Sequence, residues 1–363
     1  MKNILIFSHE FPPFGGGAGV VAKDYAYLLS SQGHSVTVLT RDIKGIEENE
    51  SYKIKTVKTF PKVWFISYIK AIDYNKFDAI ILNDNASVYF AGMFFSKKLL
   101  SKSVAFLHGS EPENIFENPS KLKKLFAFRY FYTKALMSVK KIIAVSNYMK
   151  EKFLSRTNLI QLENKIEVQY TSIDTNIFYK EKDEKFREKL SIDNSANILL
   201  SVSRIVEGKG YFEMIEVFKK LVSENNDYVW IVIGTGNYLK TLENLVTQYK
   251  LEKNVMFLGA ISRDKLSYYY SNVDVFWLLS NFDESFGLVY LEAQACGCPV
   301  LGRNKAGVKE AINDGKSGFL VHSQEEVLEI LKSKRYLELK QDDILGFASM
   351  FSLSEQVKFL EKL

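Results

Sequence analysis

The stretch Glu284-Ser-Phe-Gly-Leu-Val-Tyr-Leu-Glu292 places two carboxylates eight positions apart, and Ala-Gln-Ala-Cys-Gly-Cys-Pro follows it directly. An apolar run with strand character, Val273–Leu279, ends shortly before Glu284. Apolar residues recur from Leu288 to Ala295 with the period of a helix. We therefore expect Glu284 on the loop after a strand and Glu292 about two turns into the next helix. Both acids then lie at the carboxyl edge of a sheet, where open α/β folds bind ligands.

Apolar runs alternate with helical patterns along the whole chain. This alternation predicts an α/β fold in which parallel sheets are joined by right-handed crossovers. The expected helices include Val20–Gln32 and Tyr211–Ser223. The expected strands are Asn3–Ser8, Ser35–Thr40, Ala79–Leu82, Ser103–Leu107, Lys141–Val145, Lys165–Tyr170, Ile198–Val202, Val229–Ile233, Val255–Leu258, Val273–Leu279 and Pro299–Leu301.

The length of the chain favours two domains. A single core rarely grows beyond roughly 250 to 300 residues, and this chain has 363 residues, of which 47% are hydrophobic. The strand pattern starts afresh near residue 196, after a charged stretch from Lys180 to Lys189, so we place the hinge at residues 171–178. The predicted divisions are residues 1–172, residues 173–345, and a closing segment at residues 346–363 that contains a short amphipathic helix, Leu353–Leu363.

Cysteine usage and hydropathy indicate a cytoplasmic protein. Cys296 and Cys298 are the only cysteines, and their spacing matches neither a zinc ribbon nor a C-x-x-C redox site. We expect buried thiols in a reducing compartment. The apolar start of the chain, residues 1–8, is too short for a signal peptide and predicts a buried strand. No stretch of about 18 apolar residues occurs, so we expect no membrane-spanning helix.

Positive charge is concentrated in the first half of the chain. Residues 1–172 carry 24 Lys and Arg against 15 Asp and Glu, whereas residues 173–363 carry 24 against 28. Within residues 97–156 there are 13 basic and 4 acidic residues. A one-sided excess of this kind indicates an anionic partner for the first half.

A glycine-rich loop, Phe14-Gly-Gly-Gly-Ala-Gly19, follows the first expected strand and precedes a helix. Glycines there let backbone N–H groups approach a phosphate at the helix N-terminus. Gly17-x-Gly19-x-x-Ala22 also satisfies a loose dinucleotide fingerprint, with Asp42 following the second strand. However, several residues separate the first strand from the glycines, whereas a dinucleotide site needs its turn directly after the strand. A plain loop entering a helix ranks above the dinucleotide site.

A second loop carries two cations. Ser203-Arg-Ile-Val-Glu-Gly-Lys-Gly210 follows the first strand of the second half and precedes an amphipathic helix. Arg204 and Lys209 are five positions apart and can bracket a diphosphate, Arg by its planar fork and Lys as a point charge. The Walker pattern G-x-x-x-x-G-K-[ST] is absent, and a solvated pair of cations is the ordinary alternative.

Together these motifs resemble those of the retaining glycosyltransferases of family 4, which have the GT-B fold. Glu284 and Glu292 match the E-x7-E signature of that family, and Arg204 and Lys209 match its R-x4-K pair. The resemblance implies that the two cations stabilise the leaving diphosphate, that Glu292 holds ribose hydroxyls and that Glu284 binds the donor sugar. The motifs run in the family's order over nearly the whole chain.

Other parts of the donor site follow from the same resemblance. Gly16 and Gly17 fall where the family's Gly-Gly pair contacts the donor phosphate or sugar, and His108-Gly matches its active-site His-Gly. Ala306-Gly307 resembles its G-G-x-x-E element with the first Gly replaced by Ala. The remaining predicted donor-binding residues are Gly234 and Gly236 of a G-x-G turn, together with Phe286, Gly287 and Leu288.

Near His108, Glu111 and Glu113 are candidates to face the acceptor, and Ser146-Asn147 matches a strand end on the acceptor side. At the hinge, Tyr170-Thr-Ser-Ile-Asp174 departs from the family's Pro-Asn-Gly-Val-Asp, so hinge geometry and acceptor contacts can differ.

The resemblance implies two Rossmann-like domains with parallel sheets facing an interdomain cleft. It implies an acceptor-side domain at residues 1–172, a nucleotide-sugar-binding domain at residues 173–345, and a C-terminal helix at residues 346–363 that crosses back to the first domain. It implies a retaining transfer of sugar from a nucleotide-sugar, with UDP-sugars favoured, to a glycan or polyprenyl-diphosphate-linked acceptor, in cell-surface polysaccharide assembly. No D-x-D motif occurs, so we expect no metal and no cofactor beyond the donor substrate. No element for nucleic-acid binding is evident. Two alternatives stay open: a nucleotide-sugar epimerase of GT-B-like fold, and a non-catalytic module that binds nucleotide-sugar or membrane.

The basic excess includes a predicted helix at residues 119–134, in which Pro119 takes the first helical position. Basic and aromatic residues are interleaved along it, from Lys121 to Lys134. One interpretation is an interfacial helix that binds anionic lipid, with the protein at the inner face of the plasma membrane. A core helix with a solvated lysine face is equally compatible with the pattern.

Overall fold

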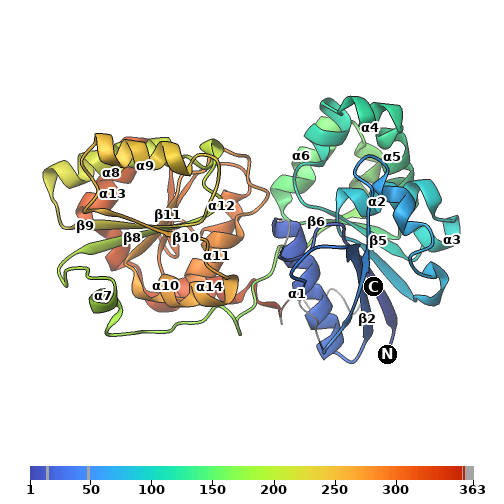
Figure 1. Cartoon of the computed structure of the whole chain (residues 1–363), viewed down its shortest axis with the longest axis horizontal. Coiled ribbons are helices and arrows are strands. Elements are labelled where there is room, and N and C mark those ends of the chain that lie inside the picture. Colours follow the sequence, from blue (N-terminus) through green and yellow to red (C-terminus); the bar gives the residue numbers. More distant parts are fainter. Residues whose placement is uncertain (14–15, 47–49, 354, 356–363) are drawn as a thin grey trace. The chain divides into compact units, whose positions relative to one another are not determined.

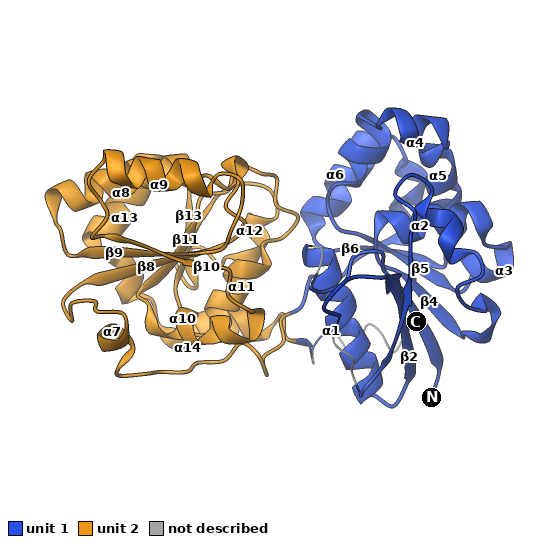
Figure 2. Ribbon diagram, in the orientation of Figure 1, with its two compact units in different colours: residues 1–172, 353–363 blue, residues 173–352 orange. Residues whose placement is uncertain are grey.

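The computed structural model describes residues 1–13, 16–46, 50–353 and 355 of the chain. The chain divides into two compact units, one formed by Met1–Ser172 with Leu353–Leu363 and the other by Ile173–Ser352 (Figure 2). Each unit holds one parallel sheet with helices on both faces (Figure 1). The predicted fold class, two Rossmann-like α/β domains, is confirmed.

The sheet of the first unit has seven strands in the order β3-β2-β1-β4-β5-β6-β7. The strands are β1 (Asn3–Phe7), β2 (Ser35–Arg41), β3 (Lys53–Val57), β4 (Ala79–Leu82), β5 (Ser103–Leu107), β6 (Lys141–Ala144) and β7 (Ile166–Val168). The α-helices are α1 (Gly17–Ser31), α2 (Asn85–Phe94), α3 (Lys97–Leu100), α4 (Lys121–Leu125), α5 (Phe128–Ser138) and α6 (Asn147–Thr157). Shorter helical turns are η1 (Trp64–Tyr68), η2 (Tyr74–Lys76), η3 (Pro112–Glu117) and η4 (Ile160–Lys165).

Both faces of this sheet are buried, as the continuous apolar runs of its strands predict. Ile4 and Ile6 of β1 belong to a core cluster with the apolar face of α1. Leu5 and Phe7 point to the other face and belong to the cluster that includes α2 and α5. The period of two along one strand thus supplies two separate cores.

The sheet of the second unit has six strands in the order β10-β9-β8-β11-β12-β13. Figure 1 shows α8, α9 and α13 on one face and α10, α11 and α14 on the other. The strands are β8 (Asn197–Val202), β9 (Tyr228–Ile233), β10 (Val255–Gly259), β11 (Val275–Leu278), β12 (Val300–Arg303) and β13 (Gly318–Val321). The α-helices are α7 (Phe186–Lys189), α8 (Tyr211–Glu224), α9 (Leu239–Gln248), α10 (Leu266–Asn272), α11 (Leu288–Ala295), α12 (Val308–Ala311), α13 (Gln324–Ser333) and α14 (Gln341–Ser349). Helical turns are η5 (Glu207–Lys209), η6 (Arg263–Lys265) and η7 (Arg335–Glu338).

Two edge strands were not predicted. The strand β3 reads Lys-Ile-Lys-Thr-Val and none of its residues is fully buried, so it lacks the apolar run that marks the inner strands. The strand β13 is four residues long, Gly-Phe-Leu-Val, and follows a turn at Gly315. Both lie at an edge of their sheets, where one side of the strand has no neighbour to set its length.

The predicted helix at residues 119–134 is two helices. The first, α4, begins at Lys121 because the Ser120 hydroxyl accepts a hydrogen bond from the Lys123 amide, so Pro119 precedes the helix. The chain then breaks at Ala127, whose φ of 48° is left-handed, and α5 begins at Phe128. The helix α4 buries no residue, whereas α5 buries four, so α5 packs in the core and α4 lies at the surface. Binding of anionic lipid by this segment stays a prediction.

The closing segment is described only in part. The helix α14 belongs to the second unit and ends at Ser349. Leu353 is 7% exposed and packs in the core cluster of the first unit that contains Ile4 and Ile6. Most of the helix predicted at Leu353–Leu363 lies outside the described residues.

Two further expectations concern burial. Cys296 and Cys298 are both buried free thiols, as predicted, and burial raises the pKa of the Cys296 thiol to about 12. In the part of the chain that the structure describes, no helix is long and apolar enough to cross a membrane.

The close packing of α2 on α5 yields a first prediction. A Cβ added at Gly92 would lie 1.8 Å from the backbone oxygen of Phe131, so Gly92→Ala should force the two helices apart and lower the free energy of unfolding by about 1–3 kcal/mol. The control is Gly346→Ala in α14, where a Cβ meets nothing within 4 Å, and which should raise stability by about 0.5–1 kcal/mol. Urea unfolding of both variants checks the prediction, and a Gly92→Ala variant as stable as wild type would contradict it.

Candidate active site

The second sheet reverses its strand order at β8. From β8 the chain continues to β9 on one side, and it later returns to place β11 on the other side. The loops after β8 and β11 therefore flank a crevice at the carboxyl edge, the position at which open α/β sheets bind ligands. The first loop contains Arg204 and Lys209, and the second contains Glu284.

Lys209 and Glu284 form an ion pair across this crevice. The Lys209 Nζ lies 2.6 Å from Glu284 Oε1, and the Ser280 hydroxyl donates to the same oxygen at 2.6 Å. The side chains are 14% and 21% exposed, so the pair is shielded from solvent more than an ordinary surface pair. Sequence motifs identified both residues but did not predict that they bind each other.

Backbone contacts hold the two loops together. The Gly208 carbonyl accepts hydrogen bonds from the amides of Asn281 and Phe282, at 2.8 and 3.2 Å. A Cβ at Gly210, which has a φ of 77°, would lie 1.9 Å from the Leu279 oxygen. Gly210, directly after Lys209, is therefore required by the close approach of the β11 loop.

The Arg204 side chain is exposed, and the described residues give it no ion pair or side-chain hydrogen bond. The loop that carries Arg204 packs against the G-x-G turn after β9, which contains Gly234 and Gly236. A Cβ at Gly234 would lie 1.9 Å from the Ser203 oxygen, and one at Gly236 would lie 2.0 Å from the Ile205 oxygen. These two glycines position the Arg204 loop, and their predicted contact with nucleotide stays a prediction.

Glu292 lies on α11, as predicted, and is 5% exposed. Its Oε1 is 3.0 Å from Arg263 Nε, and its Oε2 accepts from the Tyr270 hydroxyl at 3.4 Å. Burial, reinforced by the charge of Glu292, raises the pKa of Tyr270 well above its usual value, so Tyr270 stays a proton donor. Sequence analysis missed Arg263, although it follows a strand end just as Arg204 does.

The turn from Glu284 into α11 contains three predicted donor-binding residues. The Phe286 ring is 3% exposed and packs on Phe351 at a centroid distance of 5.4 Å, so only its backbone can meet a ligand. Gly287 has a φ of 111° and caps α11, and a Cβ there would lie 2.7 Å from the Tyr290 ring. Leu288 is the first residue of the helix.

The loop after β12 supports the same turn from the other side. The Gly307 amide donates to the Glu284 carbonyl at 2.9 Å, and a Cβ at Gly307 would lie 2.3 Å from the Ser285 oxygen. Ala306, the residue that departs from the family pattern, has a left-handed φ of 52°. Ala306 thus keeps the left-handed backbone conformation that a glycine would adopt without steric cost.

In the first unit, His108 directly follows β5. Its Nε2 is 3.3 Å from Asn83 Oδ1. The Asn83 amide nitrogen donates to the Ala18 carbonyl at 2.8 Å, which fixes the amide orientation and makes His108 Nε2 the donor. Burial lowers the pKa of His108 to about 4, so the ring is neutral at physiological pH.

Glu111 does not face an acceptor, contrary to the prediction. It is 1% exposed, and its carboxylate accepts from the amides of His108 at 2.8 Å and Gly109 at 2.6 Å. Glu111 therefore holds the His108-Gly109 turn in place. Glu113 pairs with Lys152 at 2.9 Å, so it too is engaged within the protein.

The loop after β1 is organised by a carboxylate that sequence analysis missed. Asp84, 7% exposed, accepts from the amides of Glu10 at 3.0 Å and Ser87 at 2.8 Å, and so joins this loop to the start of α2. Gly16 donates its amide to Glu10 Oε2 at 3.2 Å, and a Cβ at Gly16 would meet nothing within 4 Å. The residues that the structure describes therefore do not require a glycine at position 16.

Gly17 begins α1, and Gly15 lies outside the described residues. Ser146, predicted near the acceptor, is fully buried and caps α6 by accepting from the Met149 amide at 3.0 Å. Among the residues with described positions, no group of three or more His, Cys, Asp or Glu side chains is arranged to hold a metal ion.

Two family models match this chain. The model described as Glycosyltransferase Family 4 matches residues 15–177, and the model described as Glycosyl transferases group 1 matches residues 182–342. The matches together span both sheets and the loops described above. The chain is therefore a glycosyltransferase, and it belongs to glycosyltransferase family 4.

Individual relatives also match this chain over most of its length. N-acetyl-alpha-D-glucosaminyl L-malate synthase of Bacillus anthracis is 26% identical over 334 residues, which cover 85% of this chain and 81% of the relative. Alpha-monoglucosyldiacylglycerol synthase of Acholeplasma laidlawii is 25% identical over 367 residues, covering 96% and 90%. The crystal structure of Anabaena Alr3699/HepE in complex with UDP and glucose matches with a TM-score of 0.80 at 19% identity, covering 100% and 99%. That likeness shows the GT-B fold.

Two half-buried histidines, His9 and His108, predict a pH dependence of stability. Burial, with a contribution from Arg41, also lowers the pKa of His9 to about 4, as burial does for His108. The folded pKa values lie below the unfolded value of about 6.5, so the unfolded state binds more protons between pH 6.5 and 4. Stability is therefore full above pH 6.5 and falls as the pH drops toward 4, by up to about 3 kcal/mol for each histidine.

The measurement is the urea midpoint as a function of pH. His108→Gln cannot be protonated and should lose less stability than wild type between pH 6.5 and 4.5. The control is His322→Gln, which removes an exposed histidine and should keep the wild-type dependence. An unchanged slope in His108→Gln would contradict the assignment of a neutral His108 ring in the folded protein.

Proposed function

We propose that the protein transfers a sugar, with retention of anomeric configuration, from a nucleotide-sugar to a glycan or lipid-linked glycan acceptor in cell-surface polysaccharide assembly. The observation that carries the donor class is the group of cations and acids at the edge of the second sheet: Arg204 and Lys209 on one loop, with Glu284 and Glu292 opposite. UDP-sugars are favoured, in line with the UDP and glucose in the HepE complex.

The proposed role of Arg204 and Lys209 is to stabilise the diphosphate as negative charge develops on it in the transition state. Arg204 is exposed and suited to bidentate phosphate binding. Lys209 is bound to Glu284 at 2.6 Å, so the diphosphate must share or replace that carboxylate. In the family mechanism that we adopt, the leaving phosphate takes the acceptor proton on the same face of the sugar.

The carboxylates of Glu284 and Glu292 can each accept further hydrogen bonds from ligand hydroxyl groups. Glu284 Oε1 is occupied by Lys209 and Ser280, whereas Oε2 accepts no hydrogen bond from the described residues, so we assign it to the donor sugar. Glu292 is oriented by Arg263, and a carboxylate has about four lone-pair sites, which leaves acceptor capacity for the ribose hydroxyls.

For the first unit we propose that Gly16 and Gly17 contact the donor phosphate and that His108 contacts the donor sugar. The open space around Gly16 supports this assignment, because a ligand explains a glycine that the fold does not need. We propose a cytoplasmic location, with contact to the inner face of the plasma membrane through residues 97–156. This part of the proposal is supported by the 13 basic residues in that segment.

The first test uses a panel of donors and acceptors. UDP-glucose, UDP-galactose, UDP-N-acetylglucosamine and GDP-mannose are each incubated with the protein, with and without polyprenyl-diphosphate sugars, and nucleoside diphosphate release is measured. Proton NMR of the product gives the anomeric configuration. Isomerised nucleotide-sugar formed without acceptor, or an inverted product, would count against the proposal.

Substitution of the cations gives a sharper test. Arg204→Ala should lower kcat/KM about 10²–10³-fold because it removes a donor aimed at the developing charge. The double variant with Lys209→Ala should be lower still. The control is Lys240→Ala, whose side chain is 82% exposed and which should keep wild-type activity. Undiminished turnover in the double variant would refute the assignment of the diphosphate site.

Metal independence is the last prediction. Because Arg204 and Lys209 supply the positive charge for the diphosphate, activity should stay within about twofold after treatment with EDTA and removal of the chelated metal. Loss of activity that returns on addition of Mg²⁺ or Mn²⁺ would contradict it.

A further inference from the structure

Asn83, the residue that follows β4, is fully buried, and its side chain bonds to three separate segments of the first unit. Its Nδ2 donates to the Ser8 hydroxyl at 2.9 Å and to the Ala18 carbonyl at 2.8 Å, and its Oδ1 lies 3.3 Å from His108 Nε2. Ser8 follows β1, Ala18 lies in the first turn of α1, and His108 follows β5. One amide therefore joins three segments at the carboxyl edge of the first sheet.

The partners of this amide allow one orientation only. A backbone carbonyl only accepts hydrogen bonds, so the atom beside Ala18 is Nδ2 and the atom facing His108 is Oδ1. The ring then carries its proton on Nε2. Burial lowers the pKa of His108 to about 4, so the ring has no second proton at neutral pH. Its Nδ1 is consequently a nitrogen that can accept a hydrogen bond but cannot donate one.

The backbone around Asn83 is held as firmly as its side chain. The Asn83 amide donates to the Phe7 carbonyl at 3.0 Å, and the carboxylate of the next residue, Asp84, accepts from the Glu10 amide at 3.0 Å. The Ser8 hydroxyl donates to the Glu10 carbonyl at 2.6 Å. The Asn83 side chain therefore cannot turn without breaking bonds to the loop after β1.

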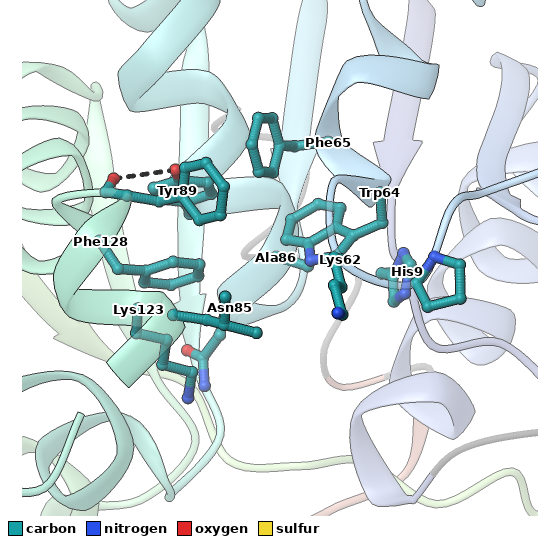
Figure 3. A pocket seen from close by; sticks show the side chains of 12 residues that line it. His9, Lys62, Trp64, Phe65, Asn85, Ala86, Tyr89, Lys123 and Phe128 are labelled. Atoms are coloured by element: carbon teal, nitrogen blue, oxygen red, sulfur yellow. Dashed lines mark hydrogen bonds between the residues drawn. The ribbon is translucent and has the colours of Figure 1, made fainter. Parts of the chain in front are cut away.

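Asn83 does not reach a ligand itself. Its exposed fraction is 0%, and it does not line the pocket at this edge of the sheet, whereas the side chains of His9 and Asn85 do (Figure 3). Asn83 can therefore affect a reaction only through the groups that it holds, which are the His108 ring and the start of α1.

We propose that Asn83 is a positioning residue for sugar transfer: it holds His108 as the Nε2–H tautomer beside the first turn of α1, so that Nδ1 accepts a hydrogen bond from a hydroxyl of the donor sugar. This inference rests on the proposed function, in which His108 contacts the donor sugar and Gly17 contacts its phosphate. Because Ala18 directly follows Gly17, Asn83 sets the ring and the phosphate-binding loop relative to each other.

The tautomer is measured in the free protein by ¹⁵N–¹H NMR of the four histidine rings, with His108→Gln to assign the signals of His108. Wild type should show a protonated Nε2 and an unprotonated Nδ1 at neutral pH. The Nε2 proton should give a sharp signal, because a hydrogen-bonded proton exchanges slowly with water, and Asn83→Leu should lose it. A proton on Nδ1 in wild type, or an unchanged signal in Asn83→Leu, would overturn the proposal.

Kinetics distinguish this role from support of the fold. With whichever of UDP-glucose, UDP-galactose, UDP-N-acetylglucosamine or GDP-mannose is turned over, Asn83→Leu should lower kcat/KM about 10–10²-fold, because the contact group is misplaced. UDP itself should bind with wild-type affinity, since the nucleotide is proposed to lie on the second unit. Wild-type kcat/KM in Asn83→Leu would overturn the proposal.

The matched control for these kinetics is Asn254→Leu. Asn254 is 8% exposed, and its Nδ2 donates to the Tyr228 carbonyl at 2.9 Å in the second unit, where β9 and β10 begin. The control variant also loses the hydrogen bonds of a buried asparagine, so it should be less stable than wild type. It should nevertheless keep the wild-type kcat/KM and the wild-type signals of His108.

Asn83→Asp keeps the shape of the side chain and serves if Asn83→Leu does not fold. Asp cannot donate to the Ala18 carbonyl, and its carboxylate lies beside His108. The pH at which Nδ1 takes up a proton should therefore rise by about 1–3 pH units, since an adjacent negative charge favours the charged ring. Ser8→Ala, which leaves the bond to Ala18 in place, should keep the wild-type tautomer. An unmoved titration in Asn83→Asp would contradict the proposed contact.

Donor analogues that each lack one sugar hydroxyl test the acceptor role of Nδ1. Loss of the hydroxyl that donates to Nδ1 should lower kcat/KM about fivefold in wild type and should have no further effect in His108→Phe. If no hydroxyl shows this dependence on His108, the proposal falls. Because the NMR experiment needs no substrate, a protein with the expected tautomer that transfers no sugar would refute the proposed function and not the bond between Asn83 and His108.

Discussion

The 2.6 Å ion pair between Lys209 and Glu284 connects the two loops that form the proposed donor site of the second unit. The pair is more shielded than an ordinary surface pair. Hydrogen bonds from the amides of Asn281 and Phe282 to the Gly208 carbonyl also join the two loops. Neither loop can move alone without breaking several of these bonds. Under the proposed function, a diphosphate that reaches Lys209 would act on Glu284 as well, and this would couple binding of the phosphate to binding of the sugar.

The glycines around this pair explain why the loops have their sequence. Gly210, Gly234 and Gly307 each lie so close to a neighbouring carbonyl that a Cβ would collide with it, at 1.9 to 2.3 Å. Their shared function is to let three loops pack without intervening side chains, and this packing presents Arg204 to solvent. Gly16 differs, because no atom of the described residues, its chain neighbours aside, lies within 4 Å of a Cβ placed there. Glycines that look alike in the motifs thus differ physically: three are required by loop packing, whereas the described fold does not require Gly16, for which we propose ligand contact.

The sequence was most informative where a segment is buried on both faces or where a motif carries its own chemistry. Eleven strands were predicted because their apolar runs are continuous, whereas β3 alternates polar and apolar residues at a sheet edge and was missed. The break at Ala127 was missed because no proline or glycine marks it, although its backbone is left-handed. Arg263 was missed because its partner, Glu292, is 29 residues away.

The sequence by itself determined the class of fold, the family and the positions of Arg204, Lys209, Glu284 and Glu292, because strand periodicity and short motifs are local properties of a chain. Only the tertiary structure determined which charged residues form ion pairs with each other. It paired Lys209 with Glu284 and Arg263 with Glu292, and it turned Glu111 inward onto the amides of His108 and Gly109. Those partners come from different loops, and their distance depends on the order of strands in the sheet, which no local pattern encodes.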